Sequence, residues 1–564
     1  MSNKLLKHIW IVLILLLISI PAVLPLLRPG FFHFSDESHI ANLYEMVRSI
    51  SSGQIPPRWA PDMVWTYGYP LFNFYYPFPF YLGSLFYLFT SSLVMSLKLT
   101  MLVTIFLSTV FMYLWLREYT GRLTSFIGAL IYLYTPYRAV DLYIRGALGE
   151  NFSFVYFPLL AFLTHRLVNN KSWRLTGILG LAIGLFVISH NLAPLLFLPW
   201  LFVYGLVCIF AEKDKSGLKK LVFSFVIGVL ISAYFWLPGF IEKSYLVAST
   251  PFDYKDHFPF IRQLIFPSWG YGASLPGIHD DLSFQIGLIN ILLIAVLIVM
   301  SVRKFVEKKF DLLKYFFVLS ILTFIILMNI RSVPFWEVTG FSNYLQFPWR
   351  LLMFTTFLSS SVFIFFKSNT FINKVVLIAL GISALIINAG YFKPSEYFYP
   401  DDNYFLNKML PRHLVGKNQY SSSPDDYRNY SEDYLLLPKW VQTRPNDEPL
   451  GKFSTKSSDL SFLIHLPKED DRMNFKTEVI GSGLLEFNSL YFPGWYAKVN
   501  GEPVNLKILD PYGSIGIDID GKISVVSVYW KETPLRMLSD LMSLFGLAIC
   551  GILIVKNEKY KNTK

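Results

Sequence analysis

Long apolar stretches recur along most of this chain, and they constrain its fold more than any other feature. A helix needs about 20 apolar residues to cross a lipid bilayer. Apolar runs close to that length lie near residues 9–27, 98–116, 123–137, 151–168, 174–190, 192–211, 221–238, 284–302, 313–330, 350–366, 373–391 and 535–555. We therefore expect an all-α polytopic membrane domain with about 12 transmembrane helices. A soluble or disordered chain is excluded, because only 16% of the residues are charged and 52 Phe and 34 Tyr must be buried or face lipid.

The basic residues beside these runs indicate how the chain is oriented. The formal net charge of +11 at first suggests a nucleic-acid partner. If the proline-broken aromatic segment 70–92 is re-entrant or interfacial, every basic cluster next to a span falls on the same side of the membrane. Positive charge concentrates in cytoplasmic loops, so we expect a multi-pass cell-membrane protein with cytoplasmic N- and C-termini. The charge then sets orientation, and no nucleic-acid partner is expected.

In this orientation the membrane domain comprises residues 1–391. Its outer-face loops are 28–97, 138–150 and 239–283. Within the first loop, apolar residues recur at helical spacing over residues 35–50. This amphipathic pattern predicts a helix that lies on the membrane surface.

The fourth outer segment, 392–534, differs from the rest because its long apolar runs stop. Alternating apolar residues in its second half predict an extracytoplasmic β-rich domain. Asn500-Gly501 and Asp520-Gly521 predict two hairpin turns in this domain. Residues 535–564 are expected to form the final transmembrane helix and a basic cytoplasmic tail.

Charged side chains at the outer membrane face are candidates for function, because they are costly to place near lipid. Asp36, Glu37 and His39 closely follow the first apolar run. A carboxylate at this position can act as a general base on a hydroxyl group or hold a divalent ion. Asp36 is also a good helix N-cap, and a histidine at the position of His39 is more often a packed interfacial residue than a functional one. Both interpretations stay open.

A second group of charged residues, Asp141, Arg145 and Glu150, lies in the loop 138–150. Arg145 follows Asp141 by four residues, which fits an ion pair on a short helix or a phosphate-binding arginine held by a carboxylate. Arg350 begins a later apolar run from the outer side. It either extends to lipid headgroups or contacts a lipid phosphate.

Other polar groups on the outer side have simpler explanations. His279, Asp280 and Asp281 fit a solvated turn better than a metal site, and His190-Asn191 can cap a helix end. Arg138 is an alternative phosphate contact. The sequence contains no Walker motif, no dinucleotide-binding glycine pattern, no HExxH and no GxSxG. An ATP-driven pump and a serine hydrolase therefore lack support.

Several short stretches resemble known bacterial membrane proteins. The stretches are HFSDESHIANLYEM, GYPLFNFYYPFPFYLGSLF, YRAVDLYIRGALGENFSFVYFPLL, LSFQIG and LQFPWRLL. They are similar to multi-pass proteins labelled 6-pyruvoyl-tetrahydropterin synthase-related. YFPGWYAKVNGEPV and TPLRMLSD resemble the ending of YfhO-like membrane proteins. The chain has no His-rich zinc site of a soluble pterin synthase, so that activity is not implied.

More remotely, the layout is similar to the GT-C class of polyprenyl-phosphate-dependent glycosyltransferases. Those enzymes place an acidic residue in the first outer loop and often another in the second. Asp36 matches the first position, and Asp141 or Glu150 matches the second. The resemblance implies a GT-C-like membrane domain that takes a sugar from a lipid-phosphate donor in the outer leaflet.

These features favour a membrane glycosyltransferase that moves a sugar from a polyprenyl-phosphate donor to an extracytoplasmic glycan or protein acceptor. Asp36 would be the catalytic base. The expected substrate-binding residues are His39, Asp141, Arg145, Glu150 and Arg350. The candidate ligands for a divalent cation are Asp36, Glu37, Asp141 and Glu150. A transporter or flippase of lipid-linked glycans and a non-catalytic cell-surface assembly protein stay open as alternatives.

Overall fold

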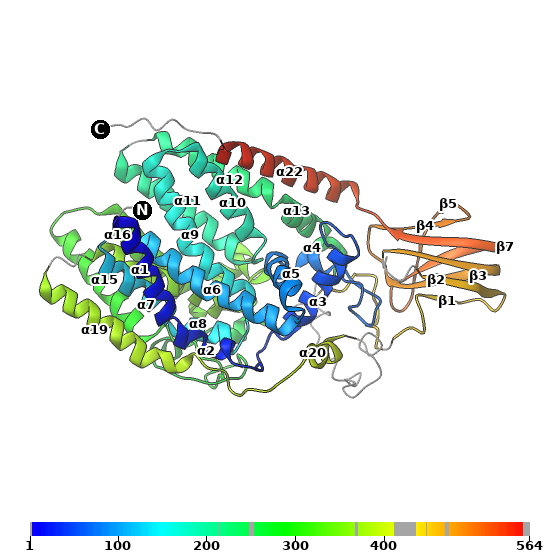
Figure 1. Ribbon diagram of the computed structural model, residues 1–564, viewed down its shortest axis with the longest axis horizontal. Coiled ribbons are helices and arrows are strands. Elements are labelled where there is room, and N and C mark those ends of the chain that lie inside the picture. The colour runs from blue at the N-terminus through cyan, green and yellow to red at the C-terminus, as the bar shows by residue number, and fades with distance from the viewer. Residues whose placement is uncertain are drawn as a thin grey trace.

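The computed structural model describes residues 3–213, 215–247, 253–366, 370–410, 436–446, 448–467 and 473–555. A helical region forms most of the molecule, and a β-sheet domain projects from one end of it (Figure 1). The last helix returns from the sheet along the helical region (Figure 1). The predicted order of a helical membrane region, a β-rich domain and a final apolar helix is therefore confirmed. The expected basic tail, 556–564, lies outside the described residues.

The α-helices are α1 (Asn3–Ile18), α2 (Ile20–Leu27), α3 (Ser38–Ser51), α4 (Leu71–Phe74), α5 (Phe78–Thr90), α6 (Leu93–Leu116), α7 (Arg122–Leu133), α8 (Pro136–Tyr143), α9 (Leu148–Asn170), α10 (Trp173–Val187), α11 (Ala193–Glu212), α12 (Ser216–Ile231), α13 (Ala233–Glu242), α14 (Ile261–Ile265), α15 (Leu288–Val306), α16 (Leu312–Leu327), α17 (Val333–Thr339), α18 (Leu352–Ser360), α19 (Phe371–Asn388), α20 (Asp402–Met409) and α22 (Pro534–Val555). Short 3-10 helices are η1 (Lys243–Tyr245), η2 (Tyr254–His257), η3 (Ile330–Ser332), η4 (Phe341–Asn343), η5 (Pro348–Leu351), η6 (Ser361–Phe365) and η7 (Ala389–Tyr391).

Six of the described helices are long and apolar enough to cross a membrane, and nine spans result if each of three bent helix pairs counts as one. The bends measure 58° between α1 and α2, 66° between α12 and α13, and 93° after α16. Three further apolar helices, α5, α7 and α10, are shorter. The helical region is thus a multi-span membrane region, whereas the count of about 12 spans and the cytoplasmic placement of the termini stay predictions.

The aromatic segment 70–92 contains two short helices, α4 and α5. Helix α5 has 13 residues and so rises about 20 Å, less than the roughly 30 Å of a bilayer core. Ser91, at φ 51°, turns the chain directly into α6, and α5 packs against α6. This short helix fits the expectation that the segment enters the membrane without crossing it.

Helix α3 shows that one prediction from the sequence was wrong. The amphipathic pattern predicted a helix on the membrane surface, but nine of the 14 residues of α3 are buried, and the helix packs against α5, α6 and α20. Its polar residues meet partners inside the protein: Arg48 Nε lies 2.8 Å from Asp62 Oδ2, and Glu45 Oε2 accepts a hydrogen bond from the Asp62 amide. The polar face of α3 therefore serves buried contacts instead of solvent.

The described sheet between Phe453 and Trp530 has seven antiparallel strands, and its central strands β3 and β7 are 17 residues long and pair along most of their length. The strands are β1 (Phe453–Thr455), β2 (Leu460–Pro467), β3 (Asn474–Leu490), β4 (Trp495–Val499), β5 (Glu502–Val504), β6 (Lys507–Leu509) and β7 (Ser514–Trp530). Asn500-Gly501 forms the predicted hairpin between β4 and β5, with φ of 52° and 91°.

The second predicted hairpin, at Asp520-Gly521, was wrong. Strand β7 continues through both residues, and Gly521 pairs with Gly481 of β3. The two long strands bend there together: Phe475 and Phe487 would lie about 40 Å apart on a straight strand, but their ring centroids are 4.9 Å apart. A Cβ at Gly481 would lie 1.8 Å from a backbone oxygen, and its φ is +106°. Glycine therefore marks a bend here, because only it fits that close approach.

The base of the sheet is fixed to the segment 28–97 of the helical region. Trp59 packs against Trp530 and Trp495, with ring centroids 4.9 and 5.5 Å away. The Leu490 amide and the Ser489 hydroxyl both donate to the Tyr67 carbonyl, at 3.1 and 2.9 Å. The segment 28–97 thus anchors the base of the sheet.

Buried ion pairs hold the last helix to the same region. Arg536 Nε lies 3.0 Å from Glu242 Oε1, and Arg58 Nη2 lies 2.7 Å from Asp540 Oδ1. Asn73 links the two pairs, because its amide donates to Glu242 at 2.9 Å and its oxygen accepts from Arg58 at 3.4 Å. Helices α13 and α22 are therefore joined to the first outer loop by charge as well as by packing.

Candidate functional site

The centre of the candidate site is a buried ion-pair cluster between α8 and α9. Arg145 Nη1 lies 2.5 Å from Asp141 Oδ1 and 2.8 Å from Glu150 Oε1. The Tyr137 hydroxyl donates to the other Glu150 oxygen at 2.8 Å. Gly146 makes the turn between the helices at φ +67°, and a Cβ there would lie 2.0 Å from the Phe34 ring. The ion pair between Asp141 and Arg145 that their spacing suggested is therefore present, and Glu150 binds the same guanidinium.

The first outer loop brings Asp36 to this cluster through backbone hydrogen bonds. The Asp36 amide donates to the Arg145 carbonyl at 2.9 Å, and the Ser35 amide donates to the Ile144 carbonyl at 3.0 Å. His39 Nε2 lies 3.8 Å from Asp36 Oδ2 and is fully buried, whereas the Asp36 side chain is 30% exposed. Among the described residues, no lysine or arginine forms an ion pair with Asp36.

Asp36 lies two residues before α3, but the observed contacts do not make it the side-chain cap of that helix. Glu37 is the N-cap residue of α3 and forms no side-chain cap hydrogen bond. The capping alternative weighed for Asp36 therefore does not account for its position. Its carboxylate is left available for another role.

Aromatic residues of the segment 70–92 line the same place. The Tyr75 hydroxyl lies 3.4 Å from His39 Nδ1 and 3.3 Å from the Tyr76 hydroxyl, which accepts from the Gly149 amide at 3.3 Å. The Tyr76 ring stacks on His190, with centroids 5.6 Å apart. This aromatic pair therefore connects the histidine behind Asp36 with the start of α9.

Arg350 reaches the cluster from a distant part of the sequence. Its Nε lies 3.5 Å from Glu150 Oε1, and its side chain is 24% exposed. The neighbouring Trp349 ring packs 4.6 Å from the Arg145 guanidinium, and its indole donates to Ser274 at 3.2 Å. The structure thus brings together all five predicted substrate-binding residues and Asp36, and their roles stay predictions.

Burial sets the charge state of the groups around Asp36. Burial and, second, the charge of Glu150 raise the pKa of Asp141 well above its usual value. Burial lowers the pKa of His39, and it lowers the pKa of His190 to about 4. Both imidazoles are therefore neutral at neutral pH, and Asp36 has an uncharged histidine behind it.

The candidate metal ligands do not fit a metal site. Glu37 faces away from the cluster, 2.6 Å from both His33 Nδ1 and Lys408 Nζ. Asp141 and Glu150 share the Arg145 guanidinium, which occupies the place that a cation would take. Within the described part of the chain, no group of three or more His, Cys, Asp or Glu side chains could hold a metal ion. The four carboxylates therefore do not converge on a common cation.

The remaining polar candidates have structural roles. His190 Nδ1 accepts from the amides of Leu192 and Ala193 at the start of α11, so the expected cap is present. Asp280 accepts from Gln263 at 2.6 Å and from the Leu275 amide at 2.8 Å, which holds a turn of the third outer loop.

Arg138 also has a structural role. It donates to Ser108 at 2.6 Å and packs over the rings of Tyr132 and Phe154.

Sequence reasoning missed four aromatic residues of this site. Tyr137, Trp349 and Tyr75 contact Glu150, Arg145 and His39, respectively. Tyr76 contacts the Gly149 amide and the His190 ring. The signal was present in part, because Trp349 precedes Arg350 and the tyrosine pair lies in the aromatic segment 70–92.

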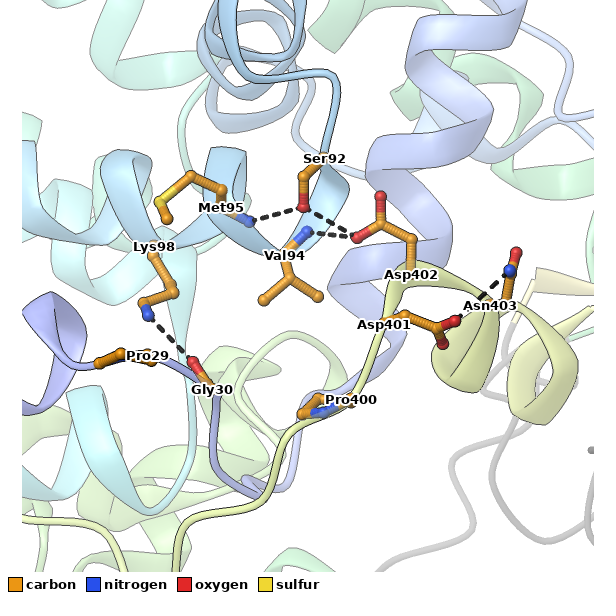
Figure 2. A pocket seen from close by; sticks show the side chains of 10 residues that line it. All are labelled: Pro29, Gly30, Ser92, Val94, Met95, Lys98, Pro400, Asp401, Asp402 and Asn403. Carbon is orange, nitrogen blue, oxygen red and sulfur yellow. Dashed lines mark hydrogen bonds between the residues drawn. The ribbon is translucent and has the colours of Figure 1, made fainter.

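A separate open pocket of about 470 Å³ lies at the start of α6 (Figure 2). Asp402 caps this helix by accepting from the Leu93 and Val94 amides at 2.7 and 3.0 Å. Lys98 donates to the carbonyls of Arg28 and Gly30. Asp402 thus holds residues 392–410 to α6, and Lys98 holds residues 28–30 to the same helix. The pocket does not include the residues of the Asp36 cluster.

Comparison with known proteins gives limited information. No family model matches the chain. A protein of Lactococcus lactis subsp. cremoris (strain MG1363), described as uncharacterized, is 22% identical over 236 residues, which is 40% of this chain and 38% of that protein. The chain thus matches well under half the length of this relative.

Two solved structures of Archaeoglobus fulgidus oligosaccharyltransferase are similar to the chain at a TM-score of 0.42. The first, of AglB with an inhibitory peptide and a dolichol-phosphate, is 13% identical and is matched over 80% of this chain and 62% of that one. The second, a complex with Zn and sulfate, is 14% identical and is matched over 78% and 58%. Matches at this level carry no conclusion about function.

Proposed function

We propose that this chain is a GT-C-like membrane glycosyltransferase of about 12 spans with cytoplasmic termini. It moves a sugar from a polyprenyl-phosphate donor to an extracytoplasmic glycan or protein acceptor. The observation that supports this most is the position of Asp36, a part-exposed carboxylate attached by its backbone to the Arg145 carbonyl, beside the ion pairs of Arg145 and Arg350 with Glu150.

In this proposal Asp36 is the general base. Its carboxylate is 30% exposed, so an acceptor hydroxyl can reach it. The hydroxyl proton moves to Asp36 while the acceptor oxygen attacks the anomeric carbon of the donor sugar. The bond between that carbon and the phosphate oxygen breaks, and its electron pair stays on the departing lipid phosphate. His39 packs behind Asp36, with its Nε2 3.8 Å from Asp36 Oδ2.

The two arginines have different roles in the proposal. Arg145 is held by two buried carboxylates, so it acts as a positioning residue for the loop that carries Asp36. The Arg350 side chain is 24% exposed, and its Nε lies 3.5 Å from Glu150 Oε1, its one ion-pair partner among the described residues. Its free donors can therefore stabilise charge on the leaving phosphate. The aromatic pair Tyr75-Tyr76 lines the sugar side of the site.

The test uses the full-length protein in sealed proteoliposomes with labelled polyprenyl-phosphate hexoses placed in the outer leaflet. Transfer of label to membrane-derived acceptor, without movement of the lipid to the inner leaflet, is the expected result. Arg350→Gln should lower kcat, because its contact to the phosphate strengthens as the bond breaks. Movement of donor lipid between leaflets with no transfer would instead identify a flippase and contradict the proposal.

A further inference from the structure

We propose that one face of the β-sheet domain is a binding site for an acidic glycan. The face belongs to β3, β7 and β4, on the half of the bent sheet that contains Trp495 and Trp530. The proposal goes beyond the sugar transfer proposed above, because binding at this face needs no catalysis. The two ideas can therefore fail separately.

The strand register places aromatic and basic side chains in two adjoining rows that cross the strands. Strand β4 pairs with β7, and β7 pairs with β3, so residues that face each other form a line across three strands. The first row is Tyr496, Tyr529 and Asn474, and the second row is Lys498, Ser527 and Lys476. Because the rows are two residues apart on every strand, all six side chains project from the same face.

This face is turned to solvent, whereas the opposite face forms the core of the sheet domain. Along β4, exposed Tyr496 and Lys498 alternate with buried Trp495 and Ala497. Tyr496 is 41% exposed although tyrosine is a large aromatic residue. The Tyr496 and Tyr529 rings lie 6.0 Å apart at 21° to each other. The pair gives a rigid amphipathic surface on which the apolar face of a sugar ring can rest.

The lysine row adds positive charge at a defined spacing. Lys498 and Lys476 lie two strands apart, which corresponds to about 10 Å. Within the described part of the sheet, neither lysine forms an ion pair with a carboxylate. Glu478 follows Lys476 on the same face and would repel an anion placed beyond the lysine row. An anionic group therefore fits over the lysines, with its sugar ring toward the tyrosines.

These features together describe a ligand that carries apolar ring faces and repeated negative charges. A polysaccharide with uronate or phosphate groups has both, and a chain lying across the strands would meet both rows. The sheet projects from one end of the helical region (Figure 1), and the two rows lie near its attached end, where the neighbouring Trp495 and Trp530 pack against Trp59. A membrane surface with anionic headgroups would offer the charges but not the ring faces.

The test measures binding of hexagalacturonate to the full-length protein in detergent by isothermal titration calorimetry. Its methyl ester, which has the same rings without the charges, is the matched ligand. Lys476→Gln combined with Lys498→Gln should weaken hexagalacturonate binding about tenfold, as expected for two exposed charge contacts. Tyr496→Ala should weaken binding of both ligands. Lys522→Gln, an exposed lysine at the bend of β7, is the control and should bind like wild type.

Three results would overturn the proposal. The first is unchanged hexagalacturonate binding in both the double-lysine and Tyr496→Ala variants, and the second is an equal loss in Lys522→Gln. The third is a combination of two observations: the wild-type protein does not bind hexagalacturonate, and the lysine variants lose binding to phosphatidylglycerol vesicles. This combination would show that the face contacts a membrane. Unfolding curves that match wild type show that each variant is folded.

Discussion

Removal of the Arg145 guanidinium should destabilise the protein strongly. Arg145→Met removes the common partner of Asp141 and Glu150, in a place where the three side chains are 7%, 0% and 2% exposed. The charge that stays buried is that of Glu150, whose pKa Arg145 holds below its usual value despite burial, whereas the pKa of Asp141 is raised. Breaking a buried ion pair by removing one partner costs about 3–5 kcal/mol, because an uncompensated charge stays buried. We expect a loss of that size in the free energy of unfolding.

The same reasoning predicts a rescue. Arg145→Met combined with Asp141→Asn and Glu150→Gln leaves no uncompensated charge in this place and should recover at least half of the loss. Replacing a buried ion-pair network by uncharged side chains often changes stability little. The free energy of unfolding is measured by titration of mixed micelles with sodium dodecyl sulfate. A loss below about 1 kcal/mol in Arg145→Met, the value of an exposed pair, would refute the reasoning, as would a triple variant no more stable than the single one.

Three further predictions concern other parts of the fold. Burial raises the pKa of Glu45 from 4.5 to about 8, so the folded protein binds a proton that the unfolded chain releases. The free energy of unfolding should therefore fall as the pH rises from about 5 to 8, and Glu45→Gln should remove this decline. Asp402→Ala removes the hydrogen bonds of Asp402 to the Leu93 and Val94 amides at the start of α6, whereas the N-cap bond of Ser92 stays, and it should cost about 1 kcal/mol in the same micelle titration. Gly146→Ala should lower the yield of folded protein in size-exclusion chromatography, because its Cβ would lie 2.0 Å from Phe34 at a φ of +67°; a normal elution profile would contradict the account of this turn.

The membrane region could be predicted from the sequence because its signal is local. Each apolar run reports its own tendency to enter lipid, and the run 535–555 corresponds to α22 (Pro534–Val555). The position of α3 could not be predicted in this way. An amphipathic helix has the same sequence pattern whether its polar face meets water or buried partners such as Asp62. Which of the two surrounds the helix depends on segments far along the chain.

The hairpin signals show the same limit. Asn500-Gly501 makes its turn because both residues adopt positive φ between short strands. Asp520-Gly521 carries the same type of signal, but β3 and β7 run past it, because Gly481 on the partner strand bends with it. A two-residue pattern cannot reveal what stands on the partner strand.

The candidate site combined predictable and unpredictable parts. The pair of Asp141 and Arg145 follows from their spacing on one helix. The contact of Glu150 with Arg350 joins segments about 200 residues apart, and no spacing rule covers such a contact. The scarcity of charge near lipid was nevertheless a sufficient reason to single out each of these residues before their meeting point was known.

The most direct test of the central claim is the transfer rate of Asp36→Asn in proteoliposomes, with polyprenyl-phosphate hexose in the outer leaflet. A general base contributes about 100-fold or more to such a step, and the substitution keeps the backbone hydrogen bond to Arg145. Asp281→Asn, an exposed aspartate of the third outer loop, is the control. The account predicts that Asp36→Asn loses about 100-fold or more in transfer rate while Asp281→Asn transfers like wild type. A wild-type rate in Asp36→Asn would contradict the account.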